Sequence, residues 1–213
     1  MSNLNVHKDR LRGLYAITDE KLIPGENFIK AVELALQGGA RIVQYRDKSA
    51  DQEKRLQQAS ALCRLCKHYQ AVAIINDDIE LAKAVDANGV HLGKDDIAIS
   101  KARQLLGDNA IIGVSCYNDV SLAITAEQLS ADYVALGAMF ASSTKPEAVI
   151  AGPDIIAKAK QQLSVPVCCI GGITVNNIHL LVQQGADMAA VISDLFSTSS
   201  IQHTAEQFSQ HFS

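Results

Sequence analysis

The sequence has no apolar run long enough to cross a membrane. Its longest uninterrupted apolar stretches, such as residues 71–75, are far shorter than the roughly 18 residues that a spanning helix requires. The N-terminal segment MSNLNVHKDRLRG also lacks an apolar stretch that could form the core of a signal peptide. We therefore expect neither a membrane segment nor a secretory signal, and we expect the protein in the cytoplasm.

A large excess of charge of one sign is absent as well. Lys and Arg total 19 and Asp and Glu total 23, which gives a net charge of −4 at pH 7. Because nucleic-acid-binding domains usually carry a basic excess, this balance argues against a nucleic-acid partner. It still allows a local pocket for a phosphate group.

Cysteine is also scarce, because 5 cysteines in 213 residues are too few for a disulfide-rich scaffold. Cys63 and Cys66 have the spacing of a redox or metal motif, but they lie within a predicted helix, and no second pair with matching spacing follows. This pattern favours buried small apolar side chains. The adjacent residues Cys168 and Cys169 should point to opposite faces of a strand.

What the sequence does have is an alternation of short apolar, β-branched runs with helix-like segments. At 48% hydrophobic and 20% charged residues, the chain is typical of globular proteins and long enough for one large domain. Runs of this kind between helical segments predict parallel strands in βα units. The eight predicted strands are 14–18, 41–46, 71–76, 89–92, 110–116, 133–137, 166–171 and 188–193.

Eight βα units predict the α/β class and a single-domain (β/α)8 barrel over residues 1–213. Between the first two strands, an apolar stripe over residues 28–36 at helical spacing ends at Gly38 and Gly39, which suit a C-terminal cap. The competing architecture is an open doubly wound sheet. Its Gly-x-Gly-x-x-Gly fingerprint is missing after Thr18, which favours the barrel.

Catalytic groups of such barrels lie where the strands end, at the C-terminal face. The second predicted strand ends in Gln44-Tyr45-Arg46-Asp47-Lys48, and strand alternation places Gln44, Arg46 and, by extension, Lys48 on one side. Two cations at one strand end suit a phosphate-bearing ligand. The alternative is that Arg46 and Lys48 are solvated loop charges.

Carboxylates follow the third and fourth predicted strands. Asn76-Asp77-Asp78 ends one strand, and the next leads past His91 to Asp95-Asp96. Magnesium is commonly held by one or two carboxylates, with water and phosphate oxygens filling its other positions. The alternative is helix capping, since each Asp pair precedes a predicted helix. His91 is more typical of a hydrogen-bonded core or rim histidine than of a catalytic base.

The later strands end in small and polar residues. The fifth strand ends at Ser115-Cys116, and neither residue is diagnostic. A loop at 141–146 combines hydroxyl groups with a cation, and the alternative is a flexible surface loop. Gly171-Gly172 and Ile192-Ser193 stand where barrels often bind phosphate through backbone N–H groups. Thr174 could cap the helix that follows. Together with the cations after the second strand, these residues suggest two phosphate-bearing ligands on opposite sides of one pocket.

Read together, these residues resemble the thiamine phosphate synthase family. The matching blocks run in the family's order over nearly the whole chain. They are GLYAITD (13–19), VQYRDK (43–48), INDD (75–78), GVHLG (89–93) with Asp95 and Asp96, GVS (113–115), SSTK (142–145) and IGGI (170–173).

The resemblance implies magnesium-dependent coupling of 4-amino-5-hydroxymethyl-2-methylpyrimidine diphosphate to a thiazole phosphate, with loss of pyrophosphate. Pyrophosphate would leave first, and the thiazole nitrogen would capture the pyrimidine methylene cation; a carboxylated thiazole would also lose carbon dioxide. By the family pattern, Lys145, Ser115 and Arg46 would act in catalysis and Asp77 and Asp96 would hold Mg²⁺. The pyrimidine diphosphate would be bound by Gln44, Arg46, Lys48, Asn76, Ser115 and Lys145, and the thiazole phosphate by Ser142, Thr144, Gly172, Ile192 and Ser193.

Three alternatives stay open. One is a relative that isomerises the carboxylated thiazole phosphate, which would not need the magnesium carboxylates and diphosphate cations together. The second is a phosphate-ligand sensor without catalysis, and the third is an unrelated barrel isomerase or aldolase, for which no strand-end lysine or acid–base pair is evident. Ser142 and Lys94 depart mildly from the family pattern. The sequence leaves the oligomeric state open, a homo-oligomer included, together with the preference between thiazole substrates, the rate-limiting step and any closure of the 141–146 loop.

Overall fold

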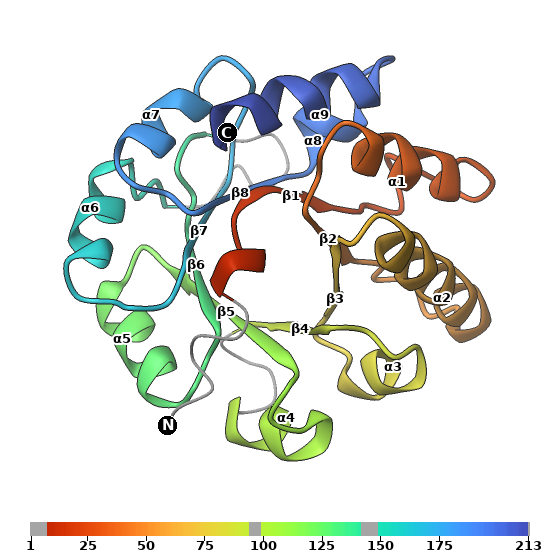
Figure 1. Cartoon of the computed structure of the whole chain (residues 1–213), viewed down its shortest axis with the longest axis horizontal. Helices are drawn as coiled ribbons and strands as arrows, with labels where there is room; N and C mark the ends of the chain where they lie inside the picture. Colours follow the sequence, from red (N-terminus) through yellow and green to blue (C-terminus); the bar gives the residue numbers. More distant parts are fainter. Residues whose placement is uncertain (1–7, 94–98, 142–148, 213) are drawn as a thin grey trace.

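The computed structural model describes residues 8–93, 99–141 and 149–212. Its strands β1 to β8 are all parallel and pair in chain order, and β8 pairs with β1 to close a barrel. The helices form a ring outside the strands (Figure 1). The predicted (β/α)8 barrel is therefore confirmed.

The elements alternate along the described chain. The strands are β1 (Gly13–Ile17), β2 (Ile42–Tyr45), β3 (Val72–Asn76), β4 (Gly89–Leu92), β5 (Ile111–Tyr117), β6 (Tyr133–Gly137), β7 (Val167–Ile170) and β8 (Met188–Val191). The α-helices are α1 (Asn27–Gln37), α2 (Gln52–His68), α3 (Ile79–Ala84), α4 (Ile99–Leu106), α5 (Val120–Gln128), α6 (Asp154–Lys160), α7 (Ile178–Gln183), α8 (Ser193–Phe196) and α9 (Ile201–Ser209). Two 3-10 helices, η2 (Lys8–Arg10) and η3 (Gln210–Phe212), lie near the ends.

All eight predicted strands are present, with ends that differ by at most two residues. The largest difference is at β8, which stops at Val191 because Ile192 and Ser193 already belong to the start of α8. The predicted helix over residues 28–36 is α1, and Gly38 takes the C-cap position while Gly39 has a φ of 97°.

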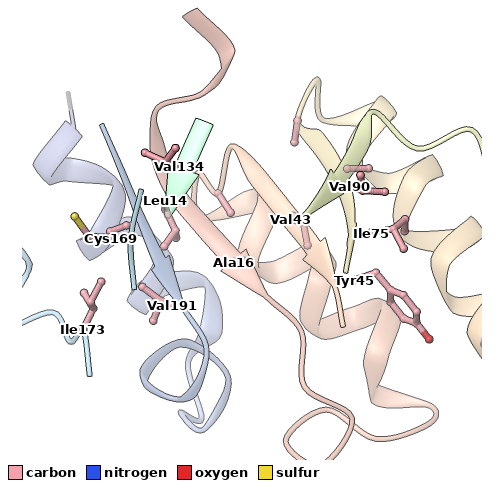
Figure 2. Close-up of a cluster of buried hydrophobic side chains, with 14 of the residues drawn as sticks. Leu14, Ala16, Val43, Tyr45, Ile75, Val90, Val134, Cys169, Ile173 and Val191 are labelled. Atoms are coloured by element: carbon pink, nitrogen blue, oxygen red, sulfur yellow. The ribbon is translucent and has the colours of Figure 1, made fainter. Parts of the chain in front are cut away.

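Two apolar cores follow from the two-residue alternation of the strands. Leu14 and Ala16 belong to the outer core between strands and helices, whereas Tyr15 and Ile17 belong to the core inside the barrel. Figure 2 shows part of the outer core. Cys169 lies in the outer core and Cys168 in the inner one, as the alternation predicts.

The N-terminal end of the barrel is closed and repetitive. The side chains of Asn88, Asp132 and Asp187, each placed just before an even-numbered strand, accept a hydrogen bond from the main chain of the preceding strand. The donors are Ala73, Ile112 and Val167, at 2.7–2.8 Å. Leu11 packs into the inner core from this side, and the red segment at the start of the described chain lies over the centre of the strands (Figure 1).

The helices are also informative. Cys66 is buried and Cys63 is partly buried within α2, as expected for packing residues. Among the described residues, no helix has the length and apolar character needed to span a membrane.

Candidate active site

A cavity of about 1010 Å³ opens at the C-terminal ends of the strands. It reaches down between the strands because the inward positions on β6 and β8 carry the small residues Ala135, Gly137 and Ala190. Larger side chains there would fill the barrel as they do at its N-terminal end. Polar residues from β2, β3, β4 and β5 form the opposite wall, namely Gln44, Arg46, Asn76, His91 and Ser115.

Arg46 is held at the rim by residues that follow β1. Its backbone N–H donates to the buried hydroxyl of Thr18 at 2.9 Å, and its guanidinium lies 3.6 Å from the carboxylate of Asp19. The side chain is 27% exposed and lines the cavity. Arg46 is therefore a positioned cation, and the alternative of a solvated loop charge does not apply to it.

Lys48 and Asp77 form an ion pair beside the cavity. The Lys48 ammonium lies 2.5 Å from Asp77 Oδ2, and the Asn76 amide donates to the same oxygen. The Lys48 side chain is about half exposed, at 52%. The alternative of a solvated loop charge therefore fits Lys48 better than it fits Arg46. The pair brings a cation and a carboxylate to the end of β3.

Asp77 and Asp78 have different roles, although they are adjacent. Asp78 caps α3, because its carboxylate accepts from Leu81 N–H at 2.9 Å, and it also pairs with Arg55 at 2.7 Å. Asp77 does not cap the helix: it has a φ of 62°, and its N–H donates to the carbonyl of His91. A non-glycine residue in this left-handed region is uncommon and is concentrated at functional sites. Helix capping thus accounts for Asp78 but not for Asp77.

A buried acid anchors the turn between Arg46 and Lys48. The Asp47 carboxylate accepts from Lys54 at 2.7 Å and from Ser49 N–H at 2.7 Å. Burial alone would raise the pKa of Asp47, but the hydrogen bonds from Lys54 and Ser49 outweigh burial and lower the pKa to about 2. Asp47 therefore stays ionised and fixes the direction of the turn that carries the two cations.

Hydrogen-bonded side chains cross the floor of the cavity. Gln44 Nε2 donates to the Tyr15 hydroxyl at 2.7 Å, and the two hydroxyls of Tyr15 and Tyr133 lie 2.8 Å apart. His91 Nδ1 lies 2.9 Å from the Tyr133 hydroxyl, and His91 Nε2 lies 2.9 Å from Ser115 Oγ. Five strands thus contribute one side chain each to a continuous chain of hydrogen bonds.

Burial fixes the protonation of this chain. It lowers the pKa of His91 to about 4, and the nearby Asp77 carboxylate opposes this only in part. Burial also raises the pKa of Tyr15 and of Tyr133 well above the ordinary value of a phenol. The imidazole is therefore neutral and both phenols keep their protons at neutral pH. His91 is a hydrogen-bonded core histidine, as its position suggested.

Ser115 lines the cavity from β5, directly before an irregularity of that strand. The pairing of β5 with β6 shifts between Ser115 and Tyr117, which is the signature of a bulge. Bulges near binding sites re-aim side chains. Ser115 still pairs in register with Ala135, whereas Tyr117 follows the shift, and both residues line the cavity.

The glycines after β7 form the opposite wall. Gly171 and Gly172 have φ values of 100° and 63°, and a Cβ on Gly172 would lie 2.4 Å from the Ala141 carbonyl oxygen. Asn177 braces this loop: its amide donates to Gly172 O at 2.9 Å and accepts from Thr174 N–H at 2.8 Å. These contacts give the backbone a fixed shape beside the cavity.

The expectation that Thr174 caps the next helix is wrong. Helix α7 begins at Ile178 with Asn177 at its N-cap position, while Thr174 lines the cavity. The Thr174 carbonyl accepts from the N–H groups of Asn177 and Ile178 at 3.1 Å, and its own N–H donates to the Asn177 side chain. Thr174 therefore contacts the start of α7 through its main chain, and the N-cap position belongs to Asn177.

Ile192 and Ser193 join the glycines at the end of β8. Both line the cavity, and Ser193 begins the short helix α8. The Asp194 carboxylate accepts from Val175 N–H at 3.0 Å, which ties the first turn of α8 to the loop after β7. The two segments predicted to bind one phosphate group are thus adjacent and connected.

The structure brings most of the described candidate residues to one cavity. Its lining includes Gln44, Arg46, Asn76, Ser115, Gly172, Ile192 and Ser193. Lys48 and Asp77 pair beside it. The remaining candidates, Asp96, Ser142, Thr144 and Lys145, lie outside the described residues.

Sequence reasoning missed Tyr15, Tyr133 and Asn177, and it named His91 without placing it in the site. Tyr15, Tyr133 and His91 link Gln44 to Ser115, and Asn177 shapes the glycine loop. A signal for Tyr15 and His91 existed, because each is polar and sits at the inward-facing parity of a predicted strand. The link through Tyr133 joins residues 118 positions apart, so local pattern could not reveal it.

The closed barrel, with its polar cavity at the C-terminal ends of the strands, defines the protein as a (β/α)8 protein with the site architecture of barrel enzymes. The family model described as thiamine monophosphate synthase matches residues 14–195, which is most of the chain. The chain therefore belongs to the thiamine monophosphate synthase family, and it is a transferase.

Individual relatives agree with this assignment. The chain is 50% identical over 202 residues to the thiamine-phosphate synthase of Nitrosococcus oceani, which covers 95% of this chain and 93% of that protein. It is 48% identical over 202 residues to the thiamine-phosphate synthase of Marinobacter nauticus, covering 94% and 90% of the two chains. Among solved structures, it is similar to thiamine phosphate pyrophosphorylase from Pyrococcus furiosus, with a TM-score of 0.87, 32% identity and 96% of each chain covered.

Proposed function

We propose that the protein joins 4-amino-5-hydroxymethyl-2-methylpyrimidine diphosphate to a thiazole phosphate, forming thiamine phosphate and pyrophosphate. The observation that carries this proposal is a cavity with two chemically distinct walls. Gln44, Arg46, Asn76 and Ser115 supply side-chain donors on one side. Gly172, Ile192 and Ser193 come from the two connected loops on the other side. The identity of the two substrates is proposed from the resemblance to the family.

The residues on the first wall suit a leaving diphosphate. In the proposed reaction the C–O bond between the pyrimidine methylene and the diphosphate breaks, and the electron pair leaves with pyrophosphate. The thiazole nitrogen then donates its lone pair to the methylene carbon. Arg46 and Ser115 would stabilise the charge that develops on the leaving group, and preorganised donors of this kind contribute strongly in a site shielded from water. Lys145 would act beside them, and Lys48 would bind the same diphosphate.

The second wall would hold the acceptor in place. Backbone N–H groups beside Gly172 and in the first turn after Ile192 would bind the thiazole phosphate, with Ser142 and Thr144 completing its site. Fixing the acceptor next to the methylene converts the second step into a reaction between neighbours. When the acceptor carries a carboxylate, the carbon–carbon bond to that group would break and carbon dioxide would leave.

Mg²⁺ fits the acidic side of this site. Asp77 offers a carboxylate directly after the cavity residue Asn76. The described residues hold no group of three or more His, Cys, Asp or Glu side chains that could bind a metal alone. Mg²⁺ ordinarily takes one or two carboxylates together with water and phosphate oxygens, so Asp77 and Asp96 would hold it with the diphosphate. The ion would supply positive charge to the leaving group. Lys48 already neutralises Asp77 and would compete for its oxygen.

The test is direct synthesis by the purified full-length protein. Both substrates are supplied with and without Mg²⁺, and thiamine phosphate is measured. We expect Mg²⁺-dependent product, and a fall of at least 100-fold in kcat for Asp77→Asn, on the scale of losing a main stabiliser of transition-state charge. No product from a folded wild-type protein that still binds either substrate would overturn the proposal and favour an isomerase or a ligand sensor.

The neighbouring acid provides the matched control. Asp78→Asn removes the same charge one residue away, but asparagine also serves as a helix cap, so activity should remain close to that of the wild type. An equal loss in both variants would mean that general negative charge matters at this strand end, and would remove the specific role of Asp77.

A further inference from the structure

The hydrogen-bonded side chains on the cavity floor form a chain with a buried centre and two ends that face the cavity. Tyr133, at the centre, is fully buried and does not line the cavity, whereas the other four residues of the chain do. Tyr133 contacts Tyr15 edge-on, with ring centroids 6.0 Å apart, and stacks on His91 at 5.6 Å. The middle of the chain is therefore rigidly packed while its ends meet the ligand space.

The direction in which the groups of this chain donate their hydrogen bonds follows from counting protons. Gln44 Nε2 can only donate, so the Tyr15 oxygen accepts at that end. The Tyr15 proton must then go to the Tyr133 oxygen, since among the described residues no other acceptor bonds to Tyr15. The Tyr133 proton in turn goes to His91 Nδ1. A neutral His91 then carries its proton on Nε2 and donates it to Ser115 Oγ.

The other proton arrangements conflict with the contact at Gln44. If Ser115 donated to His91, the chain would reverse, and the Tyr15 hydroxyl would face the Gln44 N–H with two donors in opposition. A doubly protonated His91 would donate at both ring nitrogens and leave the Tyr15 proton with no acceptor among the described residues. An unpaired buried donor costs far more than a made hydrogen bond returns. With Gln44 Nε2 on the Tyr15 hydroxyl, only one direction satisfies every group.

We propose that Tyr15, Tyr133 and His91 are positioning residues that keep Ser115 as a hydrogen-bond donor to the ligand and hold the Gln44 amide in one orientation. With His91 donating to its oxygen, Ser115 has its own proton left for a partner in the cavity. This inference rests on the proposed function, in which Ser115 meets a diphosphate. A diphosphate presents acceptor oxygens only, so a serine fixed as donor suits it, whereas a serine committed to His91 would not.

The first experiment reads the direction of the chain without any substrate. Protein labelled with ¹⁵N-histidine is studied by two-bond ¹H–¹⁵N correlation at pH 7.5, which shows which ring nitrogen carries the proton. The protein has 6 histidines, so the His91 signals are those missing from a His91→Asn sample. We expect a proton on Nε2 and none on Nδ1. A proton on Nδ1, or on both nitrogens, would overturn the proposed direction.

The second experiment cuts the chain where no ligand can reach. Tyr133→Phe keeps the ring and removes one hydroxyl that lies outside the cavity lining. Because His91 Nδ1 then loses its donor, Ser115 is no longer constrained, and a second His91 protonation pattern should appear. We expect kcat/KM for the pyrimidine diphosphate to fall roughly 3- to 10-fold, the scale of one hydrogen bond. The KM for the thiazole phosphate should stay unchanged.

Tyr69→Phe is the matched control, because it removes a tyrosine hydroxyl that bonds to Gln37 at 3.2 Å on the outer side of the barrel. It should leave the His91 spectrum and both KM values as in the wild type. Wild-type kinetics for the pyrimidine diphosphate in Tyr133→Phe would overturn the positioning role. A wild-type protein that makes no product would defeat the proposed function. Because the spectrum is recorded without substrate, it would still test the direction of hydrogen-bond donation.

Discussion

The two ends of the barrel use polar side chains in opposite ways. At the N-terminal end, Asn88, Asp132 and Asp187 repeat one contact, a side-chain oxygen that accepts from the main chain of the preceding strand. At the C-terminal end, β2, β3, β4 and β5 contribute different polar residues, and these face a cavity. One contact is repeated at the N-terminal end, whereas the polar side chains differ at the C-terminal end. The barrel therefore places the groups that stabilise the fold and the groups that face a ligand at opposite ends.

The closed end gains its stability from complete pairing. Arg103 donates to Asp132 at 2.6 Å, and Lys160 donates to Asp187 at 2.7 Å, so the acids are neutralised as well as hydrogen-bonded. At the open end, by contrast, Arg46 lies 3.6 Å from Asp19, and the close pair of Lys48 with Asp77 leaves the lysine about half exposed. Substitutions at the first end should therefore change the free energy of unfolding, and those at the second end should change kinetics.

Asp132→Ala should give the largest effect on stability. The change leaves the buried Ile112 N–H without its acceptor and Arg103 without its carboxylate, which costs about 3 kcal/mol by comparison with similar buried groups. The free energy of unfolding is measured by urea titration, and kcat at 20 °C should be unchanged. Asp132→Asn retains an oxygen for Ile112 and should recover part of the loss. A fall in kcat for a folded Asp132→Ala protein would contradict the separation of the two ends.

Gly172→Ala should give the largest kinetic effect among changes that leave charge untouched. The new Cβ would lie 2.4 Å from Ala141 O and 2.7 Å from Phe140 O, at a φ of 63°. The loop must shift, so kcat/KM for the thiazole phosphate should fall roughly 30-fold, which corresponds to about 2 kcal/mol. The KM for the pyrimidine diphosphate should change little.

Gly107→Ala separates the clash from backbone strain. Gly107 also has a positive φ, 85°, but a Cβ there meets nothing within 4 Å, and the residue lies in the loop after α4 at the closed end. It should cost about 1 kcal/mol of stability with no kinetic change. If both variants lose activity equally, the glycine loop after β7 has no special part in binding.

Asp47→Asn tests an exception to this division of the barrel, because Asp47 is an acid that stabilises the fold at the C-terminal end. Because the folded-state pKa of Asp47 is lowered to about 2, its carboxylate stabilises the fold above the ordinary pKa near 3.8, and this contribution is lost as pH falls toward 2. We expect a loss of about 1 kcal/mol at pH 7 relative to the wild type. Urea titrations at pH 7, 5 and 3 should show that the difference in free energy of unfolding between wild type and variant narrows only at the lowest pH. If this difference is constant with pH, the charge of Asp47 is not its cause.

The fold was predictable because its signals are local. Each strand is a short apolar run, and alternation along it separates the inner from the outer core, as Cys168 and Cys169 show. The candidate residues Gln44, Arg46, Asn76 and Ser115 were found because parallel strands in a barrel end at the same face. Position along a strand was therefore enough to group them.

Other parts of the site depend on contacts that no local pattern encodes. The cap assigned to Thr174 was wrong because Asn177, three residues on, holds the N-cap position of α7 and also bonds to the glycine loop. The pairing of Lys48 with Asp77 joins residues 29 positions apart. The division of labour between Asp77 and Asp78 depends on one positive φ, which residue type alone does not specify.

The repeated contact at the closed end also decides which side chains meet at the other end. Asn88, Asp132 and Asp187 stand opposite Ala73, Ile112 and Val167, 15 or 20 residues earlier, so each contact forms within one βα unit. A slip of one residue would turn every side chain of a strand to its other face. By fixing the register of β3 with β4, β5 with β6 and β7 with β8, these three side chains determine that His91, Ser115 and Tyr133 point inward. The register set at the N-terminal end of the barrel thus determines which side chains form the active site at the other end.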